Sequence, residues 1–292
     1  MIICIGDKTG SAQIDTLGAQ LVSLTSASGT EYLWQGDPQY WSGQAPVLFP
    51  IVGELRNGKT NINGKEYPMK RHGFARRMQF TKLSSTASSA VFSLQSSDET
   101  HAQYPFEFVL MVTYRFHESA LITEFNVTNL GKEPMPFVVG GHPAFNCPLS
   151  GSERFEDWAI EFEQKETADC PKIDPEKGLI SFDQRVSILK NENTISLNHN
   201  LFDNDALVFD SLKSKKVKLF STKSGQGVEM DFSDFRYLGI WSAQNNAPFV
   251  ALEPWTGCAT AEDEDDHFAN KRGMMTLQPQ QNAVNRFTIT IL

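Results

Sequence analysis

Hydrophobic residues recur at every second position over long stretches of this chain. From Phe106 to Phe116 every even-numbered residue is large and apolar, and the alternation resumes from Leu121 to Val127 after the short turn HESA. A period of two is typical of a β-strand with one buried face. The two stretches therefore predict an antiparallel hairpin.

The same pattern returns nearer the carboxyl terminus. VKLFS and VEMDF, residues 217–221 and 228–232, flank the glycine-containing turn TKSGQG, and FTITI at 287–291 ends the chain as a further strand. Helical periodicity is scarce, and only SDETHAQYPF, residues 97–106, fits one short turn or helix. We therefore predict a second hairpin, a terminal strand and few short helices.

Many short strands without an alternating strand–helix rhythm predict an all-β fold, specifically a large antiparallel β-sandwich. No internal repeat and no low-complexity linker divides the chain, so residues 1–292 are expected to form one domain. A hydrophobic fraction of 40% and a charged fraction of 21% are sufficient for a sizeable core.

Charge and cysteine content narrow the classes of partner. A formal net charge of -9 argues against a nucleic-acid partner, which requires a broad basic face. The four cysteines lie far apart without a CxxC pair, as expected for free thiols in a reducing compartment. The acidic run EDEDD, residues 262–266, is interpreted as a solvated loop rather than a cation site.

The amino terminus does not have the pattern of a secretory signal. MIICIGDKTG lacks a basic segment followed by an apolar stretch of signal-peptide length, and no apolar run approaches the ~20 residues that span a bilayer. We therefore expect a cytoplasmic protein without a membrane partner.

Two segments in the first third of the chain combine apolar and cationic residues. LFPIVGELRNGK, residues 48–59, presents Arg56 after an apolar strand, although a solvated arginine in a turn is an alternative. MKRHGFARR, residues 69–77, places His72 among Lys70, Arg71, Arg76 and Arg77. In an acidic protein, this local reversal of charge indicates a site for an anion or for hydroxyl oxygens.

Two later segments place an acid–base residue among apolar ones. His142 follows two glycines and precedes a proline at the end of an apolar strand in FVVGGHPAFNCP, residues 137–148. Glu253 is the only charge in FVALEPWTG, residues 249–257, so it either points to solvent or is held for chemistry. A glutamate and a histidine that face one pocket can act as general base and general acid. This chemistry needs neither a metal nor a cofactor, and the motifs HExxH, GxSxG, GxGxxG and the P-loop do not occur.

These motifs resemble the aldose 1-epimerase (galactose mutarotase) superfamily, and most closely its LacX-like branch. The resemblance spans nearly the whole chain and rests on several separated segments in the same order: EYLWQGDPQYWSGQAPVLFPIVGELRNG, RHGFAR, GGHPAFN, LFDNDALVFD, GIWSAQNNAPFVALEPWTG and NKRGMMTLQP. It implies a large β-sandwich with a sugar in an open cleft on one sheet. It also implies cofactor-free interconversion of the α and β anomers of a free aldose.

The resemblance also implies roles for individual residues. Glu253 would remove the anomeric hydroxyl proton, and His142 would protonate the ring oxygen. His72 and Arg56 would bind sugar oxygens, and Asp205 would bind further hydroxyls, with Asp203 in the same loop as an alternative. Of the five tryptophans, Trp255 is the candidate for contact with the sugar, since large aromatics in a sandwich are mostly core.

Three alternatives remain at this stage. A sister branch acts on hexose 6-phosphates and also carries HGFAR, so Arg76 with Arg56 and Lys70 or Arg71 would bind phosphate. A non-catalytic sugar-binding protein on the same fold would not need both His142 and Glu253. A glycosidase would use Glu253 with Asp205 as its two carboxylates. The residues reveal neither the preferred sugar nor the oligomeric state.

Overall fold

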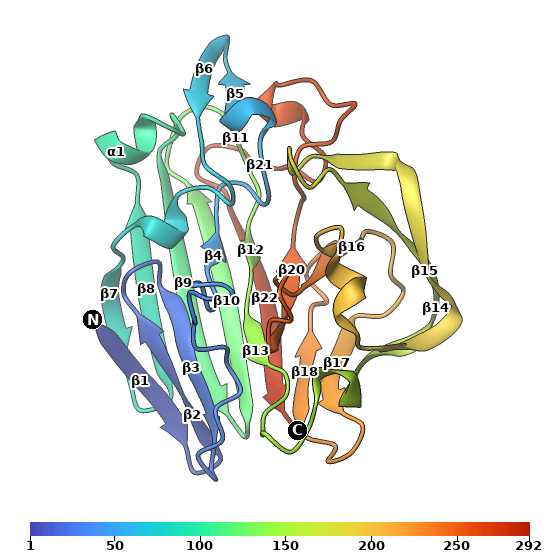
Figure 1. The fold of residues 1–292 in the computed structure, drawn as a ribbon. Helices are drawn as coiled ribbons and strands as arrows, with labels where there is room; N and C mark the ends of the chain where they lie inside the picture. The colour runs from blue at the N-terminus through green and yellow to red at the C-terminus, as the bar shows by residue number, and fades with distance from the viewer.

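Antiparallel strands account for most of the regular structure, as predicted (Figure 1). The computed structural model describes residues 1–292. Its larger sheet has nine strands in the spatial order β15-β14-β17-β18-β22-β10-β9-β8-β7. In chain order these are β7 (Thr81–Ser85), β8 (Ser89–Gln95), β9 (Phe108–His117), β10 (Ala120–Asn129), β14 (Trp158–Ile173), β15 (Ile180–Ser196), β17 (Lys216–Ser221), β18 (Gly227–Asp231) and β22 (Asn282–Ile291).

Both predicted hairpins and the terminal strand belong to this sheet. β9 and β10 are joined through Glu118 and Ser119, which both have positive φ angles, as a tight two-residue hairpin turn requires. β17 pairs with β18, and the terminal strand β22 inserts between β18 and β10. The apolar positions of β9 are buried, which confirms that the alternation marks its core face.

A second sheet packs over the first. Its strands follow the order β16-β19-β20-β12-β4, and β13 also pairs with β20. They are β4 (Val47–Leu48), β12 (Gly140–Gly141), β13 (Ala144–Asn146), β16 (Leu207–Phe209), β19 (Tyr237–Trp241) and β20 (Phe249–Trp255). Val250 and Leu252 of β20 belong to the same buried cluster as Leu110 and Phe125 of the larger sheet. The two sheets therefore enclose a common apolar core.

Smaller elements complete the fold. Ser97 caps the predicted short helix α1 by accepting a hydrogen bond from the Thr100 N–H, and the Thr100 hydroxyl accepts one from the Ser97 N–H. None of the helices has the length and hydrophobicity needed to span a bilayer. All four cysteines are unpaired. The remaining elements are β1 (Ile2–Asp7), β2 (Gly10–Asp15), β3 (Gln20–Ser26), β5 (Lys59–Ile62), β6 (Lys65–Pro68), β11 (Met135–Phe137), β21 (Met275–Leu277), helix α1 (Asp98–His101) and short 3₁₀ helices at Arg56–Gly58, Ala75–Arg77, Phe155–Asp157, His199–Phe202 and Phe268–Asn270.

The hairpin of β14 and β15 extends from the edge of the larger sheet as an arm (Figure 1). Its register shifts repeatedly, which bends the strands away from a flat sheet. The backbone of Ile180 exchanges hydrogen bonds with Thr260 and Glu262, so the far end of the arm is tied to the segment after β20. This connection brings the arm to the outer face of the second sheet.

Four of the five residues of the acidic run at 262–266 are exposed, as predicted for a solvated loop, but the run is also paired with other parts of the chain. Asp263 pairs with Arg272, Asp266 pairs with Arg56, and the Glu264 side chain is buried against Lys271. Four of its five carboxylates have a polar or charged protein partner; Asp265 accepts from Asn270. These four contacts hold the loop in place, and only the Glu262 side chain has no partner within the chain.

Candidate active site

The two faces of β20 have different surroundings. All seven of its residues are buried. Val250 and Leu252 point into the core between the sheets, whereas Glu253 and Trp255, which alternate with them, line a cavity on the other face. Glu253 therefore does not point to solvent, because the outer face of this strand is covered as well.

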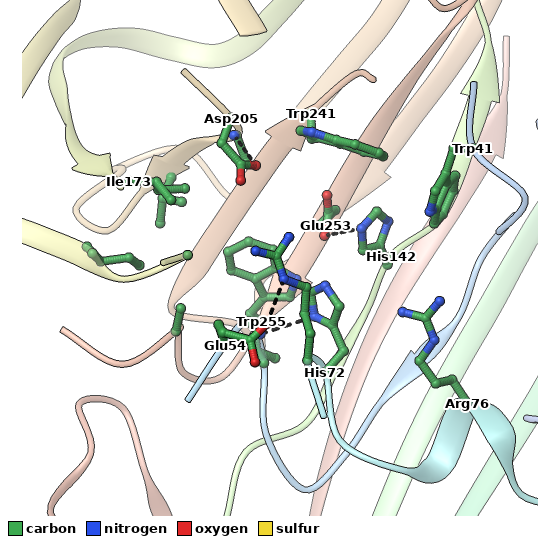
Figure 2. A pocket seen from close by; sticks show the side chains of 18 of the residues that line it. Trp41, Glu54, His72, Arg76, His142, Ile173, Asp205, Trp241, Glu253 and Trp255 are labelled. Carbon is green, nitrogen blue, oxygen red and sulfur yellow. Dashed lines mark hydrogen bonds and ion pairs between the residues drawn. The ribbon is translucent and has the colours of Figure 1, made fainter. Parts of the chain in front are cut away.

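Glu253 meets His142 at the floor of this cavity (Figure 2). His142 directly follows β12, and β12 pairs with β20 through Gly140 and Trp255, so the sheet register brings the two side chains together. His142 Nε2 lies 3.1 Å from Glu253 Oε2, with side-chain exposures of 8% and 2%. The distance is that of an ion pair, but neither Glu253 Oε2 nor His142 Nδ1 has a hydrogen-bond partner.

Burial opposes charge on both members of this pair. It raises the pKa of Glu253 well above its ordinary value, and the negative charge of Asp205 raises it further. Burial lowers the pKa of His142 below that of a free imidazole. Across the interval between these shifted pKa values, the pair as a whole keeps one titratable proton, whichever side chain carries it.

Two glycines make room for Trp255 beside the pair. A Cβ on Gly239 would come within 2.5 Å of Trp255 Cη2, and one on Gly140 within 2.7 Å of its Cδ1. Both glycines lie on strands that pair with β20. The indole therefore lies flat against the sheet and forms an apolar wall of the cavity, which supports the placement predicted for Trp255.

His72 lies at the same cavity in a defined protonation state. Its Nδ1 accepts a hydrogen bond from the Gly53 N–H at 3.1 Å, so Nε2 carries the proton of the neutral ring, and no protein group accepts from it. Burial, followed by the nearby charges, lowers the pKa of His72 well below its ordinary value. Its φ of 65° and the tight packing of Gly73 against the Phe49 carbonyl set the direction of the side chain.

Three arginines surround the cavity, and they differ in how they are paired. Arg71 donates to Glu54, and Arg77 donates to the Gly73 carbonyl. Arg76 lines the cavity without an ion pair or hydrogen bond, and burial lowers its pKa. An unpaired, half-buried guanidinium is an uncommon arrangement and offers donors to a ligand.

The structure distinguishes the two aspartates of the FDNDAL loop by position. Asp205 lines the cavity and has a φ of 74°, with one carboxylate oxygen accepting from the Ala206 N–H. Asp203 is exposed and lies outside the cavity lining. Of the two, only Asp205 is positioned to contact a ligand beside Glu253.

Arg56 does not reach this cavity, contrary to the expectation that it binds sugar oxygens. Its Nε pairs with Asp266 at 3.0 Å, and its Nη2 donates to the carbonyls of Ala261, Glu262 and Glu264. The guanidinium is therefore occupied by the acidic loop. Arg71 and Arg76 are the cations that line the cavity instead.

Sequence reasoning did not assign two aromatic residues to the site. Trp41 stacks on the His142 ring, and Trp241 meets that ring edge-on (Figure 2). Both line the cavity, together with Ile173 and Ile180 from the arm. Most large aromatics in a sandwich belong to its core, so no local signal marks these two as site residues.

The cavity has a volume of about 340 Å³, within the usual range for a small-molecule site. Its lining combines aromatic walls with cationic and acidic groups, a mixture suited to a polar, hydroxyl-rich ring. No group of three or more His, Cys, Asp or Glu side chains is arranged to hold a metal ion.

Comparison with known proteins identifies the family. The model of the aldose 1-epimerase family matches residues 1–263. The plasmid and chromosomal LacX proteins of Lactococcus lactis subsp. lactis are each 42% identical over 298 residues, covering 100% of both chains. The chain therefore belongs to the aldose 1-epimerase family, as the sequence motifs had indicated.

Solved structures agree with this assignment. A galactose mutarotase related enzyme from Lactobacillus acidophilus is 33% identical, with a TM-score of 0.95 over 100% of this chain and 97% of that one. A galactose mutarotase-like protein from Lactobacillus casei is 31% identical, with a TM-score of 0.93 over 100% of both chains. The fold is thus the galactose mutarotase-like β-sandwich.

Proposed function

We propose that this protein is a cofactor-independent aldose 1-epimerase that interconverts the α and β anomers of a free hexose. The observation that carries the proposal is the buried contact between Glu253 and His142, at 3.1 Å, in which Glu253 Oε2 has no hydrogen-bond partner. A buried carboxyl oxygen without a hydrogen-bond partner is costly to maintain, which supports a role for it in binding and chemistry.

The geometry of the pair suits a hemiacetal carbon. The anomeric hydroxyl oxygen and the ring oxygen are bonded to the same carbon atom, so an acid and a base that act on them must be close neighbours. Glu253 takes the proton of the anomeric hydroxyl, that oxygen becomes the aldehyde oxygen, and the bond from C1 to the ring oxygen breaks. His142 delivers a proton to the ring oxygen as it leaves.

Reversal of these steps on the other face completes the exchange. The open-chain sugar rotates about its C1–C2 bond, and the former ring oxygen attacks the opposite face of the aldehyde. That oxygen returns its proton to His142, and Glu253 gives its proton to the new anomeric hydroxyl. Burial favours the form of the pair with its proton on Glu253, whereas the cycle starts with the proton on His142, so the bound sugar must shift that balance.

Three side chains around the pair are the proposed sugar ligands. His72 offers its free Nε2–H as a donor, Asp205 offers a carboxylate oxygen as an acceptor, and Arg76 offers an unpaired guanidinium. Trp255 supplies an apolar surface for the face of the sugar ring. We propose that these side chains bind the sugar hydroxyls, while Glu253 and His142 act at the reacting carbon.

A hexose 6-phosphate is the second candidate substrate. The unpaired Arg76, with Arg71 and Arg77 around the same cavity, supports an anionic substituent. Arg71 is already paired with Glu54, and Arg77 is engaged with a backbone carbonyl, so Arg76 is the one cation among the three that is not engaged. We therefore place the free hexose first.

The test is NMR exchange between the anomers of glucose, galactose and glucose 6-phosphate, each with wild type and Glu253→Gln. We expect wild type alone to accelerate exchange, and the preferred sugar identifies the substrate class. Equal acceleration by Glu253→Gln would contradict the assigned base. Saturable binding without acceleration by a folded wild type would instead support the non-catalytic sugar-binding alternative.

A further inference from the structure

The His142 ring lacks the hydrogen bond that usually orients a reactive imidazole. In most sites, one ring nitrogen donates to a carbonyl or carboxylate, which determines the tautomer and the direction of the other nitrogen. Here Nε2 faces Glu253, whereas Nδ1 is buried without a hydrogen-bond partner. Beyond the contact with Glu253, the orientation of the ring therefore depends on packing.

Aromatic rings supply that packing. The indole of Trp41 stacks on the imidazole, with ring centroids 4.8 Å apart and an interplanar angle of 25°. Trp241 meets the same ring edge-on at 5.6 Å and also contacts Trp41 edge-on at 5.4 Å. A stacked face and a perpendicular edge together restrict rotation of the imidazole about its bond to Cβ.

Trp41 is itself held firmly by the chain around it. Its backbone N–H donates to the Asp37 carbonyl at 2.9 Å, and its carbonyl accepts from Trp34 Nε1 at 2.8 Å. Gly43 lies against the indole, and a Cβ there would come within 2.4 Å of Trp41 Cζ2. Glycine is therefore required at position 43 of the WSG sequence, since only glycine there leaves space for the indole of Trp41.

We propose that Trp41 is a positioning residue whose stacked indole, with the clearance provided by Gly43, holds the His142 imidazole toward Glu253 in place of a hydrogen bond. The consequence for the reaction rests on the proposed acid role of His142, but the orientation itself does not. Without the indole, the ring can rotate, and its proton no longer points at the leaving oxygen. Misplacement of a reacting group by about 1 Å costs on the order of 10²-fold in rate.

The experiment compares Trp41→Leu, Trp41→Phe and Gly43→Ala with wild type. We expect Trp41→Leu to lower kcat about 10- to 100-fold with little change in KM. Trp41→Phe is expected to recover most of kcat, because it restores an aromatic face. Gly43→Ala should fall between them, because it displaces the indole without removing it. Tyr40→Leu is the matched control, since Tyr40 contacts Trp34 but not His142.

A second readout does not depend on activity. In histidine-labelled protein, the His142 ring proton signals, assigned by their loss in His142→Gln, should lie upfield because of the Trp41 ring current. They should move downfield in Trp41→Leu and return in Trp41→Phe.

Unchanged His142 signals in Trp41→Leu would overturn the proposal. A rise in KM with unchanged kcat would also overturn it, since Trp41 would then be a surface for the sugar. If no sugar is turned over, the NMR result still decides the orientation, while the proposed function fails separately.

Discussion

Two buried acid–base pairs differ in how completely the protein satisfies them. Lys271 and Glu264 lie 3.6 Å apart with side-chain exposures of 3% and 7%, close to the 8% and 2% of His142 and Glu253. Lys271 donates to Thr260, and Glu264 accepts two backbone N–H groups.

The pair of Glu253 and His142 has no such hydrogen bonds. Neither Glu253 Oε2 nor the second ring nitrogen of His142 has a hydrogen-bond partner. The two pairs are equally buried but differ in their hydrogen-bond partners. A pair with all its partners stabilises a loop, whereas a pair without them is available to a ligand. The distinction can be tested by making matched changes in both pairs.

The largest difference is expected in turnover. His142→Gln should lower kcat by about 10²- to 10⁴-fold because it removes the proposed acid. The double variant with Glu253→Gln should be little worse than either single variant, because the two residues act as a unit. Glu264→Gln is the matched control, and anomer exchange per folded molecule should stay within a few-fold of wild type. A loss at Glu264 as large as at His142 would remove the distinction between the pairs.

The opposite result is expected for stability. Lys271→Met leaves a buried carboxylate without its cation, and breaking such a pair costs about 3–5 kcal/mol in the free energy of unfolding. Urea denaturation measures this loss, with His142→Gln as the comparison, which should cost far less. Equal losses in the two variants would show that the pair of Glu253 and His142 also holds the fold together.

Two arginines allow a parallel comparison. Arg76 has no protein partner, so Arg76→Gln should raise KM about 10- to 100-fold, as expected when a charged hydrogen bond worth roughly 1.5–3 kcal/mol is lost. Arg56 is occupied by the acidic loop, so Arg56→Gln should lower stability and leave KM unchanged. Steady-state kinetics on both variants decides the matter, and a reversed pattern would exclude Arg76 as a ligand.

The smallest expected effect is that of Glu253 on the pH dependence of the free energy of unfolding. Because the pKa of Glu253 is raised on folding, its contribution to stability is present below the unfolded pKa and is lost as pH rises through the folded one. Glu253→Gln does not titrate and should therefore be more stable than wild type at pH 7. Thermal melts should show this gain shrinking as pH falls toward 4. A variant less stable than wild type at pH 7 would contradict the unsatisfied state of Glu253.

Features encoded by local pattern could be predicted from the sequence. The hairpins of β9 with β10 and of β17 with β18 follow from alternating residues that are adjacent in the chain. Glu253 could be singled out because one charge among apolar residues is conspicuous wherever the strand lies.

Features that depend on distant partners could not be predicted. Arg56 is occupied by a loop more than 200 residues away, so nothing near it indicates that its guanidinium is unavailable. The choice of Asp205 over Asp203 depends on the backbone conformation of a short loop. Trp41 has the same local appearance as a core aromatic, and only the folded chain brings it against His142.

The arm of β14 and β15 has a consequence for how this fold diversifies. It supplies Ile173, Gly178 and Ile180 to the cavity wall but makes no hydrogen bond to Glu253 or His142. Mutational drift in this one hairpin can therefore alter which ligand fits the cavity while Glu253 and His142 are inherited unchanged. Among relatives of this chain, we expect proteins that differ in ligand preference to differ in the length and side chains of the arm.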